Sequence, residues 1–282
     1  LEKMETASMK KTKTLYVTDL DGTLLNASQR ISECSLNIIN SLVNKGMLFT
    51  YATARSITSA SIVAKGLSTQ IPIIAYNGAF IIEPDTRRIL FKEQFTKEQT
   101  GSVIEIFEKN HISPLVYSFV EGVEKVSWLL GTENEPKQHY LDSRKGDKRL
   151  RPIQNNVELY AGEIFYFTCL GEKEELEPAY ELIKDDDRYT CTFQKELYRD
   201  EWWLEIMPKK ATKANAILKL KDLWKCDRIV SFGDAMNDIP MFQISDECYA
   251  VENAVEELKT LATAVIPSNN EDGVAKWLLD NV

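Results

Sequence analysis

The first part of the chain alternates short apolar runs with stretches whose apolar residues recur at helical spacing. Residues 15–19 and 47–53 are apolar runs of strand length, whereas residues 32–45 and 56–65 carry apolar side chains every three or four positions. A third strand pattern follows at 73–76. Strand, helix, strand, helix and strand with short connections predict a parallel, doubly wound α/β sheet.

The rhythm changes near residue 80. Strand patterns now outnumber helix patterns, which cover residues 97–110 and 174–184, and residues 131–156 form a polar, charged stretch. The strand patterns lie at 80–82, 89–91, 115–120, 126–130, 164–170, 190–193 and 203–207. This order of elements predicts an α+β unit that is inserted into the first domain.

Beyond the inserted unit, the alternation of strands and helices returns and continues to the end. We therefore expect a doubly wound α/β core over residues 9–83 and 209–282, with an α+β domain over residues 84–208 between its two halves. Residues 1–8 are expected to be a tag or a disordered N-terminus, because Met9 is a natural beginning.

Composition narrows the classes of partner. The 282 residues carry a formal net charge of −9, whereas nucleic-acid binding requires a basic face, so we expect no nucleic-acid partner. The longest apolar stretch, residues 71–82, is broken by Pro72 and is too short to span a bilayer, so we expect no membrane partner. Five cysteines without paired spacing suit a reducing compartment, and we expect a cytoplasmic protein.

Polar side chains of the ligand type follow the predicted parallel strands. Asp19 ends the first strand, Asp21 comes two positions later, Thr53 ends the second strand, and residues 233–238 follow a later one. Because ligands of such sheets bind beyond the carboxyl ends of the strands, these residues mark a candidate site. In an extended segment Asp19 and Asp21 face one small volume, where they need a proton, a basic side chain or a metal between them.

Taken in their order along the chain, these residues and those named next resemble the four motifs of the haloacid dehalogenase superfamily. Within that superfamily they are most similar to the Cof-like sugar-phosphate phosphatases. The resemblance rests on Asp19-x-Asp21-Gly22-Thr23, Thr53, Lys213 and Gly233-Asp234-x-x-Asn237-Asp238, with accessory segments at 52–55, 76–79 and 269–274. Each motif alone is weak, but their combined order is specific. The resemblance implies a hydrolase core and identifies the inserted domain as a cap that selects the leaving group.

The resemblance also assigns the chemistry of the aspartates. Asp19 is the expected nucleophile, which forms an aspartyl-phosphate. Asp21 is the expected general acid and base, and Gly22 allows the turn that brings the backbone close to phosphate. Asp234 is the expected Mg²⁺ ligand, together with the Asp19 carboxylate and the backbone carbonyl of Asp21.

Other residues are expected to hold the phosphoryl group or to support the site. By the resemblance, Thr53 and Lys213 bind phosphate, and Asn237 is a further polar contact. Asp238 either pairs with Lys213 or caps the helix expected to begin near Ile239, two alternatives that we weigh equally. Arg55 is a phosphate ligand or a loop anchor, and Asn270 is a contact to phosphate or cap. The Asn-Gly pair at 77–78 favours a turn over a site role.

We therefore expect a Mg²⁺-dependent phosphomonoesterase that hydrolyses small phosphorylated metabolites, with sugar phosphates as the class that the resemblance implies. One alternative is a phosphomutase that uses the same aspartyl-phosphate. Another is a non-catalytic phosphate-binding protein with a relict site, against which the intact set of Asp19, Asp21, Lys213 and Asp234 argues. The oligomeric state stays open between a monomer and a weak homo-oligomer.

Overall fold

The computed structural model describes residues 12–196 and 199–282, so the expectation for residues 1–8 lies outside the described part. Contacts between Cα atoms divide the chain into two units, one that ends at Phe91 and resumes over Lys213–Val282, and one over Lys92–Thr212. The sequence pattern predicts the first boundary between residues 83 and 84. The observed division follows residue 91, because the strand predicted at 89–91 lies in one sheet with the two predicted strands that precede it, which belong to the first unit.

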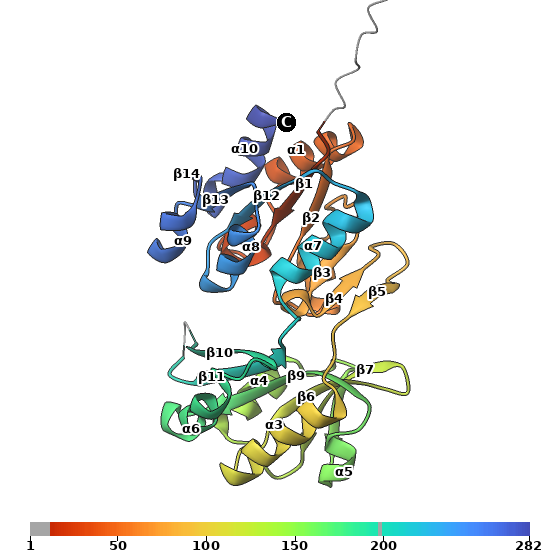
Figure 1. Ribbon diagram of the computed structural model, residues 1–282, viewed down its shortest axis with the longest axis vertical. Coiled ribbons are helices and arrows are strands. Elements are labelled where there is room, and N and C mark those ends of the chain that lie inside the picture. The colour runs from red at the N-terminus through yellow and green to blue at the C-terminus, as the bar shows by residue number, and fades with distance from the viewer. Residues whose placement is uncertain (1–11, 197–198) are drawn as a thin grey trace, which may run out of the picture. The chain divides into compact units, whose positions relative to one another are not determined.

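The first unit contains a five-stranded sheet with every neighbouring pair parallel (Figure 1). Its order is β14 (Ala264–Ile266), β13 (Glu247–Val251), β12 (Arg228–Gly233), β1 (Thr14–Thr18) and β2 (Leu48–Tyr51). Strand β1 lies between β12 and β2, and the apolar side chains Leu15, Val17 and Phe232 are fully buried, as expected where helices cover both faces of a parallel sheet. The chain leaves β1 toward β2 and later builds β12, β13 and β14 on the other side, so the order of the strands reverses beside β1.

Helices flank this sheet. They are α1 (Glu33–Asn44), α2 (Ile57–Val63), α7 (Lys213–Trp224), α8 (Ile239–Gln243), α9 (Glu256–Leu261) and α10 (Gly273–Asn281). Helix α1 packs against α10, and α7 packs against α8. The side chains of Ser32 and Ser56 accept hydrogen bonds from the backbone N–H groups of Ser35 and Ser59 and so cap α1 and α2. These caps are the physical reason why both helices begin where the sequence predicted.

The strand predicted at 73–76 forms, but it does not belong to the parallel sheet, so that part of the prediction is wrong. It forms β3 (Ile73–Ala75), which belongs to a three-stranded sheet with β4 (Phe80–Ile82) and β5 (Ile89–Lys92). One parallel bridge, between Ala52 and Ile74, joins β3 to the chain beyond β2. The ladder stops there because β3 is short and the left-handed turn at Tyr76–Gly78 follows it directly.

The second unit has a six-stranded sheet in the order β10 (Tyr189–Lys195), β11 (Trp202–Pro208), β9 (Glu163–Gly171), β6 (Leu115–Val120), β7 (Val123–Leu129) and β8 (Leu150–Ile153). Its helices are α3 (Lys97–Lys109), α4 (Glu135–Ser143), α5 (Asn156–Leu159) and α6 (Lys173–Ile183). All neighbouring strands are antiparallel except β7 and β8. The sequence pattern missed α4 and β8 inside the polar stretch, because few apolar residues mark them.

One apolar cluster forms the core of the second unit. It includes Val103 and Phe107 of α3, Leu176 of α6, and Phe167 and Ile206 of the sheet. The first and second units are therefore an α/β core and an α+β domain, as the sequence predicted.

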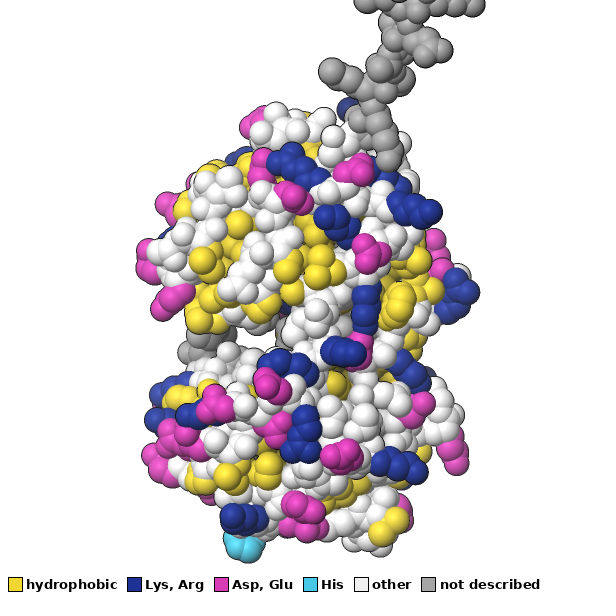
Figure 2. All heavy atoms as spheres, in the orientation of Figure 1, with side chains coloured by type: hydrophobic (Ala, Val, Ile, Leu, Met, Phe, Trp, Pro, Cys, Tyr) yellow, Lys and Arg dark blue, Asp and Glu magenta, His cyan; other side chains and the backbone are white. Residues whose placement is uncertain are grey.

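Two surface properties bear on the classes of partner. Lys and Arg side chains are interspersed with Asp and Glu side chains on the face in Figure 2, where no continuous basic area is visible among the described residues. Within the described ranges, none of the helices combines the length and the apolar character that crossing a membrane requires.

Candidate active site

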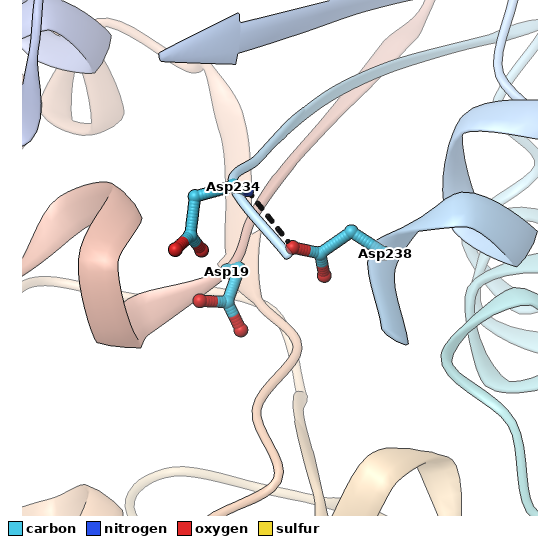
Figure 3. A group of neighbouring side chains, drawn as sticks. All are labelled: Asp19, Asp234 and Asp238. Carbon is cyan, nitrogen blue, oxygen red and sulfur yellow. Dashed lines mark hydrogen bonds between the residues drawn. The ribbon is translucent and has the colours of Figure 1, made fainter. Parts of the chain in front are cut away.

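Three carboxyl groups meet at the carboxyl ends of β1 and β12 (Figure 3). Asp19 follows β1 in an extended conformation and donates its backbone N–H to the carbonyl of Phe232 at 2.9 Å. Asp234 and Asp238 follow β12, and one oxygen from each of the three aspartates lies within 4.8 Å of the others. Asp19 and Asp238 are buried, and Asp234 is partly buried. This concentration of negative charge in a low dielectric needs cations or protons beside it.

Lys213 supplies one positive charge from the first residue of α7. Its Nζ lies 2.5 Å from Asp19 Oδ1 and 2.7 Å from Asp238 Oδ1, and the side chain is 1% exposed. Burial alone would lower the pKa of Lys213, but the two carboxylates outweigh burial and raise it. The ammonium therefore stays charged and joins the ends of two strands to the start of a helix.

Asp238 uses both of its carboxylate oxygens. One accepts from Lys213, and the other accepts the backbone N–H groups of Asp234 at 3.0 Å and Ala235 at 3.2 Å. Its side chain makes no capping hydrogen bond to α8. Of the two alternatives from the sequence, the structure shows the pairing with Lys213. Asp238 thus fixes the loop that carries Asp234.

Asp234 lies against the turn that follows β1. Thr23 Oγ1 donates to Asp234 Oδ1 at 2.9 Å. Gly22 has a φ of +76°, and a Cβ at this position would lie 2.2 Å from Asp234 Oδ2. A glycine is therefore required twice here, for the backbone conformation and for the close approach of the carboxyl group.

Burial dominates the protonation of two of these acids. It raises the pKa of the Asp19 carboxyl well above its ordinary value, an effect that the neighbouring carboxylates increase and Lys213 opposes. Burial, followed by the charge of Asp238, raises the pKa of Asp234 to about 7, against the hydrogen bond from Thr23. Both shifts thus come first from burial, and the neighbouring carboxylates add to it.

The Asp21 carboxylate does not belong to this cluster. The chain turns over Leu20–Leu24 instead of staying extended, so the alternation of a strand, on which the expectation for Asp19 and Asp21 rested, ends at Asp19. The side chain of Asp21 is 49% exposed and is bound by Arg55 through two hydrogen bonds of 2.8 and 2.6 Å. The third carboxyl group of the cluster is that of Asp238.

Thr53 and Asn77 hold the neighbouring strand ends together. Thr53 is fully buried, and its Oγ1 accepts the backbone N–H of Arg55 at 3.1 Å. The backbone N–H of Asn77 donates to the Thr53 carbonyl at 2.9 Å. Asn77 adopts a left-handed conformation, as the expected turn requires, and its side-chain oxygen also accepts from Asn237 Nδ2 at 3.3 Å. The turn thus places the amide of Asn77, which the sequence assigns only to a turn, beside that of Asn237, which it assigns to the site.

A second group of amide side chains fixes the loop after β1. Asn270 Oδ1 accepts the backbone N–H of Ala27 at 2.9 Å, so this residue supports the loop. Asn253 Nδ2 donates to the Gly22 carbonyl at 2.8 Å. The sequence did not single out Asn253, although it lies two residues beyond β13, and the rule that polar residues follow strand ends could have found it.

Comparison with known proteins places the chain in a family. A family model described as haloacid dehalogenase-like hydrolase matches residues 16–278. The 5-amino-6-(5-phospho-D-ribitylamino)uracil phosphatase YwtE of Bacillus subtilis (strain 168) is 29% identical, with 92% of this chain and 95% of that protein covered. A second phosphatase of this name from the same organism, YitU, is 24% identical, with 94% and 96% covered.

Solved structures share the fold. TM0651 from Thermotoga maritima superposes with a TM-score of 0.76 at 26% identity, with 96% of this chain and 98% of that chain covered. A haloacid dehalogenase-like hydrolase from Bacteroides thetaiotaomicron gives a TM-score of 0.75 at 22% identity, with 96% and 100% covered. The α/β core with its inserted antiparallel sheet is thus an arrangement found in solved structures.

Proposed function

The chain belongs to the haloacid dehalogenase-like hydrolases and is a phosphatase, and we propose that it hydrolyses phosphomonoesters of small metabolites through a phosphorylated Asp19. One observation carries this proposal. The Asp19 carboxylate lies at the end of strand β1, between β12 and β2, where Lys213 holds it at 2.5 Å. The other charged groups that act on it are the acids Asp238 and Asp234, so a phosphoryl group can approach it only where positive charge offsets the repulsion.

The residues present fit a divalent cation. Three carboxyl groups with oxygens within 4.8 Å of one another face a single ammonium group. Hard oxygen ligands of this kind suit Mg²⁺. Because Asp238 already uses both oxygens, we assign the ion to the carboxylates of Asp19 and Asp234, with the backbone carbonyl of Asp21 as a further ligand. When bound, Mg²⁺ neutralises charge on the transferring phosphoryl group.

The residues of the chain divide the reaction into two displacements. In the first, an Asp19 oxygen bonds to phosphorus, the bond from phosphorus to the ester oxygen breaks, and Asp21 gives its proton to the leaving alkoxide. In the second, water attacks the phosphorus and Asp21 takes a proton from that water. The bond to Asp19 breaks, and inorganic phosphate leaves. Lys213, Thr53 and Asn237 are the proposed contacts to the phosphoryl oxygens.

The substrate class rests on the relatives. YwtE and YitU are named for a substrate whose phosphate is carried by a ribitylamino group. We propose phosphate esters of sugars and sugar alcohols as the class that this chain hydrolyses. The inserted domain is the proposed cap that selects among them.

Release of inorganic phosphate tests the proposed function. We expect the protein to release phosphate from several sugar phosphates with Mg²⁺ and to stop when a chelator removes the ion. Transfer of the phosphoryl group to a second hydroxyl of the sugar, without free phosphate, would identify a phosphomutase. Binding of phosphate esters without turnover would identify a binding protein. Either result would overturn the proposal.

Substitution of the nucleophile gives the sharper test. Asp19→Asn is expected to abolish turnover while the protein stays folded, because an amide cannot form the phosphorylated intermediate. Peptide mapping after an acid quench should find the phosphoryl group on Asp19 in the parent. Equal turnover in the variant and the parent would remove Asp19 from the mechanism.

A further inference from the structure

Arg55 and Asp21 form a forked ion pair beside the proposed nucleophile. Arg55 Nε donates to Asp21 Oδ2 at 2.8 Å, and Nη2 donates to Oδ1 at 2.6 Å. A guanidinium that binds both oxygens of a carboxylate fixes the plane of the carboxylate as well as its position. Asp21 is half-exposed, so its orientation depends on this contact more than on packing.

The guanidinium is itself held in place. Arg55 Nη1 donates to Ser59 Oγ at 3.0 Å, and Nη2 also donates to Gln29 Oε1 at 3.1 Å. The main chain of Arg55 is fixed too, because its carbonyl accepts the backbone N–H of Tyr76 at 3.0 Å. With an exposed fraction of 18%, the Arg55 side chain is a partly buried support for Asp21.

These contacts separate two roles for Arg55. All three of its side-chain nitrogens already donate to Asp21, Ser59 or Gln29. Of the five N–H donors of a guanidinium, four are used, which leaves one for a phosphate oxygen. A ligand of the phosphoryl group would need its fork open toward the substrate. The observed fork is closed on Asp21.

We propose that Arg55 is a positioning residue that aims the Asp21 carboxyl group at the leaving oxygen. This inference rests on the proposed function, in which Asp21 gives a proton to that oxygen as the ester bond breaks and later takes one from water. In this role Arg55 binds Asp21 and does not contact the phosphorus or the ester oxygen. It acts by holding Asp21 in the orientation that lets the proton move.

The role of Arg55 predicts a dependence on the leaving group. An ester with a poor leaving group needs the proton from Asp21, whereas 4-nitrophenolate leaves without one. In Arg55→Met, kcat/KM for phenyl phosphate should fall about tenfold or more beyond the fall for 4-nitrophenyl phosphate. Across a series of aryl phosphates, log kcat/KM should decline more steeply with leaving-group basicity in the variant than in the parent.

A double-mutant cycle tests whether Arg55 acts through Asp21. With 4-nitrophenyl phosphate, Arg55→Met combined with Asp21→Asn should be no slower than Asp21→Asn alone, because the carboxylate that Arg55 aims is already gone. Arg88→Met is the matched control, since Arg88 makes a similar forked contact with Glu83 elsewhere in the first unit. The control should keep the parent's slope, and thermal unfolding should show that each variant is folded.

The outcomes separate this inference from the proposed function. An equal loss for every aryl phosphate, with a raised KM, would make Arg55 a phosphate ligand and overturn the positioning role. Losses that multiply in the double variant would overturn it as well. A parent protein that releases no phosphate from the whole series would overturn the proposed function, and the role of Arg55 with it.

Discussion

Lys213 Nζ lies 2.7 Å from one carboxylate oxygen of Asp238, whose other oxygen accepts two backbone N–H groups of the loop after β12. Asp238 thus connects the start of α7 to the loop that carries Asp234. Both side chains are almost completely inaccessible to water. A buried charge without its partner is costly, so these residues stabilise the site as a group and not as separate pairs.

Removal of the ammonium should therefore cost both stability and activity. Lys213→Met leaves Asp19 and Asp238 buried without their cation, and we expect a loss of about 3–5 kcal/mol in the free energy of unfolding. The value of kcat should fall about 10²–10³-fold through the lost phosphoryl contact. Urea unfolding and phosphate release measure the two effects. Lys209→Met is the control, because that lysine is 58% exposed and should lose neither. A variant as stable as the parent would contradict the assigned network.

Gly22 should tolerate no side chain, for a reason that a matched glycine can isolate. In Gly22→Ala the new methyl group meets the Asp234 carboxylate in addition to the strain of a positive φ. In Gly46→Ala, φ is also positive at +102° but no atom lies within 4 Å of the added Cβ. We expect Gly46→Ala to lose about 1 kcal/mol of stability through the positive φ alone, and Gly22→Ala to lose more because of the added contact with Asp234. Only Gly22→Ala should also lose phosphatase activity, and full activity there would refute the close approach to Asp234.

The site residues differ in how much information is required to locate them from the sequence. Asp19 and Asp234 sit directly at strand ends, and the rule for parallel sheets locates them without a structure. Locating Lys213 requires more information, because several lysines lie nearby in the sequence and only the order of the motifs distinguishes it. Its contact with Asp238 across 25 positions depends on how α7 meets the loop after β12, which periodicity does not contain.

The direction of the Asp21 side chain and the turn after β3 could not be predicted, because both depend on the local backbone conformation. The alternation of a strand predicts the direction of Asp21 only while the backbone stays extended, and it turns at Leu20. Tyr76 and Asn77 both have positive φ values, a conformation that an Asn-Gly pair indicates but an aromatic residue does not. That turn ends β3 and moves the strand into a separate small sheet. The strands and helices themselves were largely predictable because their caps and apolar spacing are local.

Divalent cation binding should be visible as stabilisation that requires Asp234. A ligand that binds only the folded state raises the free energy of unfolding by about 2.7 kcal/mol at about 100 times its Kd. We expect Mg²⁺ to raise the Tm of the parent and to leave that of Asp234→Asn unchanged. Asp280→Asn, which alters an exposed carboxylate near the C-terminus, should keep the parent's response. An equal Mg²⁺ effect in all three proteins would place the ion elsewhere.

Glu205 gives the inserted domain a pH-dependent stability that is independent of the catalytic site. Burial raises the pKa of its carboxyl group above the ordinary value, against hydrogen bonds from Tyr166 and from Thr192, whose Oγ1 donates at 3.0 Å. A raised pKa means that the folded state binds the proton more tightly than the unfolded state. The stabilisation by this proton is therefore complete below the ordinary pKa of 4.5 and is lost as the pH rises through the folded-state pKa.

Glu205→Gln removes this dependence, because glutamine keeps the shape of the protonated acid and cannot ionise. We expect the variant and the parent to have similar Tm values near pH 4.5, the ordinary pKa of the carboxyl group. At neutral and alkaline pH the variant should have the higher Tm. Thermal unfolding over a series of buffers measures the difference. Glu174→Gln on the surface of α6 is the matched control, and it should follow the parent at every pH. A Glu205→Gln variant that is less stable than the parent at alkaline pH would show that the ionised carboxylate is favoured in the folded domain.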